Sequence, residues 1–414
     1  MTISSSLYTA ESALAASGIA MEVVGNNIAN SNTVGFKAST ANFADIFAAA
    51  QGELEIGDGV DLAAVKRLDT QGAVETTTSA LDLAVVGQGF FVLKDSGGNS
   101  FYTRAGQFTP DANGNIVNAD GLFLQGTAGN ITLDANLTLP ATATTTLNIK
   151  LNLDATAVPG AAFPAGPDAA PSAWLSAAGF STTLPLYDSS GEGHDATILF
   201  RQSSANSWDY VVVAKRSEID STAPTTTDLR QIGGGTLTFD SGGALTGATG
   251  GINAVAWTNG GATQAITGTA LNFAGSTQFA SPSGVLALSQ NGAPEGTLTR
   301  ISIDEQGRIN AEFSNGGQQV LAQVALANFN NSGGLEAIGD TLLAATADSG
   351  AASIGTPGEG ALGAVLSGAL EQSNVDLAQE FVNMILAQRS FQLSSRVISV
   401  ADQMYAVASG LKTY

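Results

Sequence analysis

Both ends of this chain carry an unbroken seven-residue repeat of mostly apolar side chains, which limits how the chain can fold. Near the N-terminus the repeat alternates spacings of four and three residues and consists of Ile3, Leu7, Ala10, Leu14, Ser17, Met21, Val24 and Ile28. This spacing is typical of a helix that packs along another helix, as in a coiled coil. Gly18 and Gly25 weaken an isolated helix. We therefore expect this helix to form when it packs against a partner.

The C-terminal end carries two lines of apolar residues. The first consists of Leu393, Val397, Val400, Met404, Val407 and Leu411. The second recurs every seven residues and consists of Leu377, Met384, Phe391, Ile398 and Tyr405. The two lines lie about 200° apart around a helix, so one partner helix can cover only one of them. The helix then lies either in the core of a large domain or between its N-terminal partner and other subunits. We favour the second interpretation because both helices are terminal.

Between the ends, short strand-like runs alternate with turn signals. Residues 149–290 differ in composition and contain all three tryptophans, so we interpret them as a domain inserted into another. The predicted fold class is α+β, with terminal heptad helices pairing as a coiled coil and two nested, mostly-β domains. The expected divisions are 1–30 with 365–414 for the helical coiled-coil domain (an inner tube in a polymer), 31–71 for an Asn-rich hinge and connector, 72–148 with 291–364 for a discontinuous β domain, and 149–290 for the inserted outer β domain.

Composition excludes several kinds of site. The 414 residues include 36 acidic and 15 basic side chains, and the formal net charge of −21 argues against binding to nucleic acid. Cysteine is absent and His194 is the one histidine, which rules out thiolate zinc sites, Cys nucleophiles and His-based triads on this chain. No carboxylate pair stands out as a general acid and base. We therefore predict no catalytic residue, no cofactor site and no metal site, and we interpret His194 as a surface residue.

Targeting signals are also constrained. The sequence has no stretch of about 18 uninterrupted apolar residues, so we expect no membrane span. The first basic residue is Lys37, whereas a Sec signal peptide opens with positive charge. Secretion of this chain would therefore use another route.

An Asn-rich segment ends the N-terminal heptad. It contains Asn26, Asn27, Asn30, Thr33, Gly35, Phe36 and Lys37. Asn, Ser and Thr side chains compete for backbone hydrogen bonds and so terminate a helix. A helix C-terminus with Asn30 or Asn32 in a left-handed conformation explains the asparagines. It does not explain the Gly-Phe-Lys sequence that follows them.

This segment resembles the signature that follows the N-terminal helix of bacterial flagellar rod and hook proteins, the axial proteins of the flagellum. Residues 86–92 and 102–108 resemble the first β-domain motif of that family. Residues 368–377 resemble the start of its C-terminal helix, and residues 381–385, 387–389 and 395–398 continue the match. The resemblance covers most of residues 1–125 and 296–412. Distal rod proteins are shorter, so the large insertion favours a hook protein, as does the stretch 186–191 with His194.

The resemblance implies a structural subunit, not an enzyme, of the flagellar hook, a curved flexible tube that transmits torque from rod to filament in swimming motility. It implies a homopolymer outside the cell in the hook and basal body, with type III export and no cleaved signal peptide. Implied partners are the distal rod protein, the hook cap, the hook–filament junction proteins and the export apparatus, without nucleic acid or a membrane span.

We expect the heptad lines to form the subunit interfaces. The expected interface residues are Ile3, Leu7, Leu14, Met21, Val24, Ile28, Leu377, Met384, Phe391, Leu393, Val397, Ile398, Val400, Met404, Tyr405, Val407 and Leu411. In this scheme Leu7, Leu14, Met21 and Ile28 meet Val397, Met404 and Leu411. The second C-terminal line then faces neighbouring subunits.

Two alternatives stay open at this point. One is a distal rod protein with an unusually large insertion. The other is a secreted β-rich protein that binds carbohydrate near Trp174, Trp208 and Trp257. Exposed, clustered tryptophans would favour the second alternative, whereas buried indoles would favour a structural role.

Overall fold

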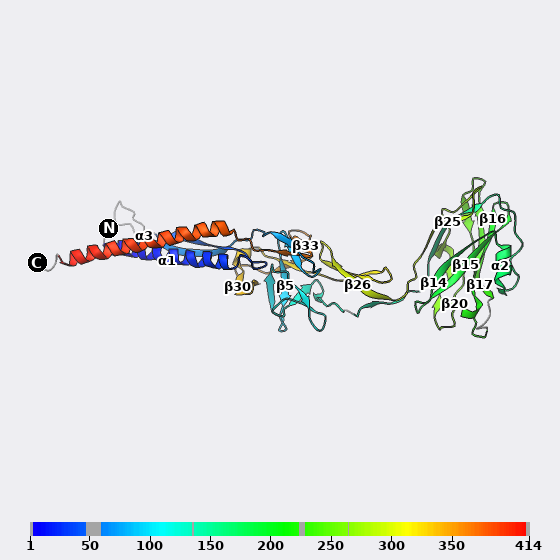
Figure 1. Cartoon of the computed structure of the whole chain (residues 1–414), viewed down its shortest axis with the longest axis horizontal. Coiled ribbons are helices and arrows are strands. Elements are labelled where there is room, and N and C mark those ends of the chain that lie inside the picture. Colours follow the sequence, from blue (N-terminus) through cyan, green and yellow to red (C-terminus); the bar gives the residue numbers. More distant parts are fainter. Residues whose placement is uncertain (1–2, 47–58, 135, 223–227, 264, 411–414) are drawn as a thin grey trace. The chain divides into compact units, whose positions relative to one another are not determined.

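The computed structural model describes residues 3–46, 59–134, 136–222, 228–263 and 265–410. Within these residues the chain is mostly β-structure with three α-helices (Figure 1). The chain divides into two compact units. The first comprises residues 1–135, 300–311 and 318–414, and the second comprises residues 136–299 and 312–317.

The first unit contains two long helices, α1 (Ile3–Ala29) and α3 (Leu377–Gly410). They lie side by side along their length (Figure 1). Near the end of α1, Asn27 Nδ2 donates to Glu380 Oε1 in the first turns of α3 at 3.3 Å, so the two helices are antiparallel. Neither they nor the short third helix combine the length and hydropathy needed to cross a membrane, as far as the described residues go.

The β-structure of the first unit is built from short strands. These are β1 (Ser39–Asp45), β2 (Val60–Arg67), β3 (Val74–Thr76), β4 (Leu83–Val86), β5 (Phe90–Lys94), β6 (Ser100–Thr103), β7 (Thr109–Pro110), β8 (Ile116–Val117), β9 (Phe123–Gly126), β10 (Gly129–Asn130), β28 (Gln318–Gln323), β29 (Leu326–Asn328), β30 (Glu336–Gly339), β31 (Leu342–Ala344), β32 (Ser353–Gly355), β33 (Ala364–Ser367) and β34 (Ala369–Glu371), with a 3₁₀ turn at Ser332–Gly334.

Three features of this unit position the residues discussed below: its largest sheet, a hairpin on α1 and the strand pair that precedes α3. The largest sheet follows the order β30-β31-β6-β5-β9-β8-β7, with β10, β29 and β32 attached. Its core includes Phe91 and Phe108, whose rings meet edge to face with centroids 5.3 Å apart. The β1–β2 hairpin packs against α1. Strands β3 and β34 pair antiparallel just before the chain enters α3. The antiparallel pairing brings segments from both ends of the sequence together.

A further sheet has the order β11-β26-β27-β28, with β11 at Thr138–Leu139, β26 at Gly296–Ile303 and β27 at Arg308–Phe313. The second unit contains β12 (Leu147–Asp154), β13 (Asp168–Ala169), α2 (Pro171–Ala177), β14 (Phe180–Tyr187), β15 (Gly193–Ser204), β16 (Ser207–Lys215), β17 (Leu229–Phe239), β18 (Leu245–Ala248), β19 (Gly251–Ile252), β20 (Val255–Ala256), β21 (Ala262–Thr263), β22 (Ile266–Thr267), β23 (Leu271–Asn272), β24 (Thr277–Phe279) and β25 (Gly284–Gln290), with 3₁₀ turns at Arg216–Glu218 and Gly268–Ala270.

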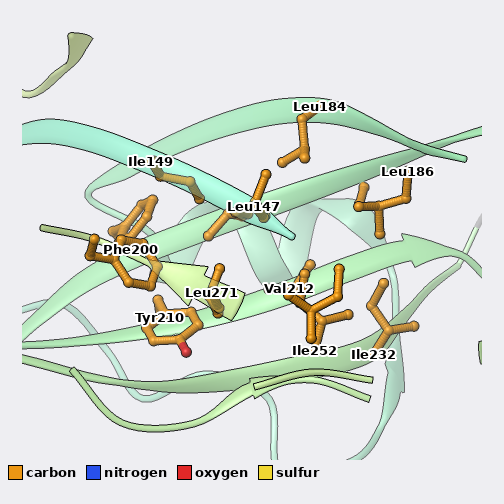
Figure 2. Close-up of a cluster of buried hydrophobic side chains, with 14 of the residues drawn as sticks. Leu147, Ile149, Leu184, Leu186, Phe200, Tyr210, Val212, Ile232, Ile252 and Leu271 are labelled. Carbon is orange, nitrogen blue, oxygen red and sulfur yellow. The ribbon is translucent and has the colours of Figure 1, made fainter. Parts of the chain in front are cut away.

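The large sheet of the second unit has the order β14-β15-β16-β17-β19-β22, and it is covered on both faces. Alternate residues of β15 and β16, such as Phe200 and Tyr210, point into one core together with Leu147 and Ile149 of β12 (Figure 2). The residues between them, such as Leu199, pack on the other face against Trp174 of α2. Central strands covered on both faces have continuous apolar runs, and β16 has such a run.

All three tryptophans lie in the second unit and are buried. Trp174 and Trp208 are fully buried, and Trp257 is 3% exposed. The indoles therefore form no exposed platform on which a sugar ring could stack. This removes the observation on which the carbohydrate-binding alternative depended.

Candidate subunit interface

The N-terminal heptad is placed on α1 as expected, and its small residues are the most buried. Ala10, Ser17 and Val24 are buried and lie seven residues apart. Leu7, Leu14, Met21 and Ile28 are half-buried. The Ser17 hydroxyl donates to the Ala13 carbonyl at 2.8 Å, so it carries no unpaired polar group into the contact. The side chain of Ile3 lies outside the described residues.

One side of α3 is less exposed than the rest. Its members include Met384, Ala387, Ile398 and Ala401, of which the alanines are buried and the other two half-buried. Their spacing places them on one face of a helix, and α1 is the element that packs along α3. Leu377, Phe391 and Tyr405 continue this side but are exposed.

The other apolar line of α3 is exposed along its described length. The exposed fractions are 62% for Leu393, 48% for Val397, 54% for Val400, 55% for Met404 and 66% for Val407. Within one chain this line is therefore left exposed, and the pairing of Leu7, Leu14, Met21 and Ile28 with Val397 and Met404 between copies stays a prediction. Leu411, the last member of that line, lies outside the described residues.

The less exposed side of α3 carries several small residues. That face carries Ala387, Ser394 and Ala401, and small residues let two helix backbones approach closely. The buried positions of α1 are small as well. The larger side chains of the Val397 line are left without a partner helix among the described residues of this chain.

The Asn-rich segment after α1 is tied to its surroundings by hydrogen bonds. Asn27 is buried; its Nδ2 donates to the Ser39 carbonyl at 2.8 Å and its Oδ1 accepts from the Ser39 amide at 2.9 Å. Asn30 Nδ2 donates to the Asn26 carbonyl at 3.0 Å, and Thr33 Oγ1 donates to Asn30 Oδ1 at 3.1 Å. Asn26 itself is exposed.

Gly35, and not an asparagine, is the left-handed residue of this segment. Its φ is +72°, while Asn30 and Asn32 are outside the left-handed region, so the expected left-handed asparagine is wrong. A Cβ on Gly35 would lie 2.4 Å from the Ala105 amide nitrogen. Glycine is needed here for its conformation and because a neighbouring backbone approaches closely.

Two residues beyond Gly35, past the half-buried Phe36, a buried cluster of charges begins. Lys37 Nζ lies 2.5 Å from Glu371 Oε1 and also donates to the Thr70 carbonyl at 2.8 Å. Arg104 Nη1 lies 3.2 Å from Glu371 Oε2. Side chains of all three charged residues are at most 7% exposed. Burial lowers the pKa of Lys37 below its ordinary value, against the opposing effect of the Glu371 carboxylate.

Sequence reasoning selected Lys37 but missed its partners. Arg104 and Glu371 both lie inside motifs that were singled out, at 102–108 and 368–377. A charged residue at a fixed place in each of three low-charge motifs was the available signal. The structure brings the three motifs together at this cluster.

A second polar cluster surrounds His194 in the other unit, and the interpretation of His194 as a surface residue is wrong. The ring is buried, lies between Asp188 Oδ2 and Glu218 Oε2 at 3.1 Å each, and stacks on Trp257 with centroids 3.7 Å apart. Asp188 Oδ2 also accepts from Asn259 Nδ2 at 2.6 Å. Burial acts to raise the pKa of Asp188, but hydrogen bonds from Asn259, His194 and Ser190 outweigh it and hold that pKa well below its usual range.

Ligand atoms of Asp188, Glu192 and His194 lie within 4.8 Å of one another, a spacing that could hold a cation. Both carboxylate oxygens of Asp188 and both ring nitrogens already have protein partners. We therefore interpret the group as a hydrogen-bonded network that fixes the β14–β15 turn to the β20–β21 hairpin.

Comparison with protein families places flagellar domains along the chain. Residues 7–37 match the flagella basal body rod protein family, and residues 84–152 match the flagellar hook protein FlgE/F/G D1 domain. Residues 152–293 match the flagellar basal body protein FlaE D2 domain. Residues 366–411 match the C-terminal family of flagellar basal body rod FlgEFG proteins.

Several flagellar hook proteins are similar to this chain over nearly its whole length. Flagellar hook protein FlgE of Salmonella typhimurium is 38% identical over 96% of this chain and 98% of its own length. The Escherichia coli K12 protein of the same name is 38% identical over 95% and 97%, and that of Treponema pallidum is 33% identical over 98% and 99%. The solved structure of Helicobacter pylori flagellar hook protein FlgE2 covers 72% of this chain and 100% of its own, with a TM-score of 0.51 at 14% identity, which is a likeness of fold. The chain belongs to the flagellar hook protein family and is a structural subunit of the bacterial flagellar hook.

Proposed function

We propose that copies of this chain polymerise through the exposed apolar line of α3, formed by Leu393, Val397, Val400, Met404 and Val407. The single observation that carries this proposal is the exposure of all five side chains on one face of a helix. Isolated exposed apolar residues are ordinary, but a continuous stripe of them indicates a contact with another molecule. In a polymer the neighbour at every position is another copy of the chain.

The α1–α3 pair gives such a polymer its geometry. In this proposal α1 covers one face of α3, and the two helices pair as a coiled coil within the chain. The opposite face of α3 then meets a different surface of the next copy. A contact between two unlike patches repeats without closing on itself and builds an open helical tube. Leu377, Phe391 and Tyr405, exposed at the edge of the α1 contact, extend the interface.

The wider role follows from the family. We propose that the tube is curved and flexible and transmits torque from rod to filament, with the terminal helices inside and the β domains outside. In this scheme residues 31–71 act as the connector between them, and the β domain is divided at 72–148 and 291–364 around an outer insertion at 149–290. The chain acts as a structural protein without catalysis.

Partners and location follow from the same scheme. We expect contacts with the distal rod protein at one end of the tube and with the hook cap and hook–filament junction proteins at the other. The subunit reaches the outside of the cell through the flagellar export apparatus without a cleaved signal peptide.

Polymerisation of purified full-length protein tests the proposal. Val397→Asp places a charge in the middle of the stripe and should raise the concentration needed for tubes to form at least tenfold, because a carboxylate would be buried at every contact (about 2 kcal/mol or more). Gln392→Asp is the matched control. It adds the same charge to an exposed position of the same helix, about 140° around from Val397.

Removal of residues 404–414 should abolish tubes and leave the thermal unfolding of the β-structure unchanged. Sedimentation and electron microscopy measure the polymer, and circular dichroism measures the fold. Tubes formed by Val397→Asp at the wild-type concentration would contradict the proposal, as would equal effects of Val397→Asp and Gln392→Asp.

A further inference from the structure

Both connections between the helices and the β-structure of the first unit pass the same buried carboxylate. Lys37 follows shortly after α1 ends at Ala29, and Glu371 precedes the start of α3 at Leu377. Besides the Lys37 contact, the Gly35 amide donates to the Glu371 carbonyl at 2.7 Å and the Gly72 amide donates to Glu371 Oε1 at 2.9 Å. Glu371 therefore holds the incoming and outgoing segments together.

Arg104 attaches this junction to the β-structure. It follows β6 directly, and besides Glu371 it donates from Nη2 to the Gly87 carbonyl at 2.8 Å and from Nη1 to the Val85 carbonyl at 3.4 Å. Its guanidinium also lies 5.2 Å from the centre of the Phe90 ring. One carboxylate thus connects three segments that are far apart in the sequence.

The charges at this junction are unequal. Two buried cations share one buried carboxylate, and carbonyl oxygens of Thr70, Val85 and Gly87 accept further hydrogen bonds from them. The buried Nε of Arg104 has no hydrogen-bond partner among the described residues, and the exposed Asp69 carboxylate attracts both cations from farther away. Removing the carboxylate would leave two like charges in a desolvated site. Breaking a buried ion pair by removing one partner is strongly destabilising, because it leaves a buried charge without its counter-charge.

We infer that the Lys37–Glu371–Arg104 cluster is the joint that fixes the terminal helix pair to the β-structure, with Glu371 as its positioning residue. In the hook, force passing between helices and β domain has to cross this joint. The inference rests on the role of the chain as a hook subunit. It does not depend on which face of α3 contacts other copies, because its first test uses the monomer.

The rate of tryptic cleavage after Lys37 measures opening of the joint, because trypsin reaches this buried lysine only if the segment around it opens. In full-length wild-type monomer, cleavage after Lys37 should be slow compared with cleavage after the exposed Arg389 and Arg396 of α3. Glu371→Gln should speed cleavage after Lys37 at least tenfold. Cleavage after Lys94 in β5, within the same unit, should stay within about twofold, because the joint and not the sheet has opened.

Two further variants make the test specific. Glu75→Gln is the matched control: it neutralises an exposed carboxylate on β3, the strand paired with β34. The glutamine oxygen can keep the hydrogen bond that Glu75 accepts from Gln372 Nε2, so cleavage after Lys37 should stay unchanged. Arg104→Gln alone should also speed cleavage after Lys37, because it removes the contacts to Glu371, Val85 and Gly87. Combined with Glu371→Gln it should have less than the product of the two single effects, because both substitutions break the same contact. Such non-additivity measures the coupling between two residues in contact.

Hooks assembled from Glu371→Gln should bend more than wild-type hooks under the same flow, at least twofold in deflection, while Glu75→Gln hooks should match wild type. The inference is overturned if Glu371→Gln leaves cleavage after Lys37 unchanged. It is also overturned if cleavage after Lys37 and Lys94 rises equally, since that means global unfolding, or if the effects of Arg104→Gln and Glu371→Gln multiply as they would at independent sites.

Discussion

Arg104 Nη1 lies 3.2 Å from Glu371 Oε2, and this contact joins the end of β6 to the strand that leads into α3. The two residues are 267 positions apart in the sequence. The whole second unit lies between them along the chain. The contact between Arg104 and Glu371 therefore joins residues that precede and follow the second unit. A short-range contact within the first unit depends in this way on segments that are distant in sequence.

Gly35→Ala should destabilise the first unit. The substitution puts a Cβ on a residue with φ +72° and 2.4 Å from the Ala105 amide nitrogen. We expect a loss of about 1–3 kcal/mol in the free energy of unfolding, measured by urea titration. Gly18→Ala in α1 is the control, since its Cβ meets nothing within 4 Å. That variant should be more stable than wild type by about 0.5–1 kcal/mol, and a gain in stability from Gly35→Ala would contradict the argument.

Ala10→Leu should push the two long helices apart. Ala10 is buried on α1, the helix that packs along α3, and overpacking of a buried site costs about 1–3 kcal/mol. Ala15→Leu makes the same change at an exposed position of the same helix and should be close to neutral. Urea unfolding followed by far-ultraviolet circular dichroism measures both. Equal losses in the two variants would mean that the helices do not pack through the Ala10 face.

Asp188→Asn should destabilise the second unit in a pH-dependent manner. The pKa of Asp188 is lower in the folded chain than its ordinary value of about 3.9, so the unfolded chain binds the proton more tightly. The stabilisation is therefore present above about pH 4 and is lost as the pH falls further. We expect Asp188→Asn to cost about 2–3 kcal/mol at pH 7.

The difference between wild type and Asp188→Asn should shrink below pH 4, as followed by tryptophan fluorescence during urea unfolding. Asp195→Asn, at an exposed carboxylate next to His194, should change stability little at either pH. A wild-type advantage that stays constant from pH 7 to pH 2.5 would rule out the proposed electrostatic origin.

Periodicity predicted the existence of the long helices but not which faces of them meet. Both apolar lines of α3 fit a heptad, so the sequence pattern could not choose between Val397 and Ile398 as the contact with α1. The less exposed side of α3 carries Ile398 together with the small residues Ala387 and Ala401. These are weak hydrophobic signals, but they determine how closely two helices can approach.

In the second unit, the sequence predicted the type of fold but not the burial of its one histidine. Alternation and apolar runs predicted a β domain, but sequence gave no reason to bury His194. Its burial depends on Asp188, Glu218, Trp257 and Asn259, which come from three separate loops. From sequence alone, a polar residue in a Gly-rich segment is expected to be exposed. Its burial can be recognised only once the fold places its hydrogen-bond partners around it.

The antiparallel arrangement of α1 and α3 has a practical consequence for labelling. Because the first turn of α1 and the last turn of α3 lie at the same end of the pair, a fluorescent protein or affinity tag fused to either terminus would crowd the same place in every copy. The turn Ser96–Asn99 between β5 and β6 is a better insertion point. Its residues 96–99 are exposed, and Gly98, at φ +87°, has no atom within 4 Å of where a Cβ would sit.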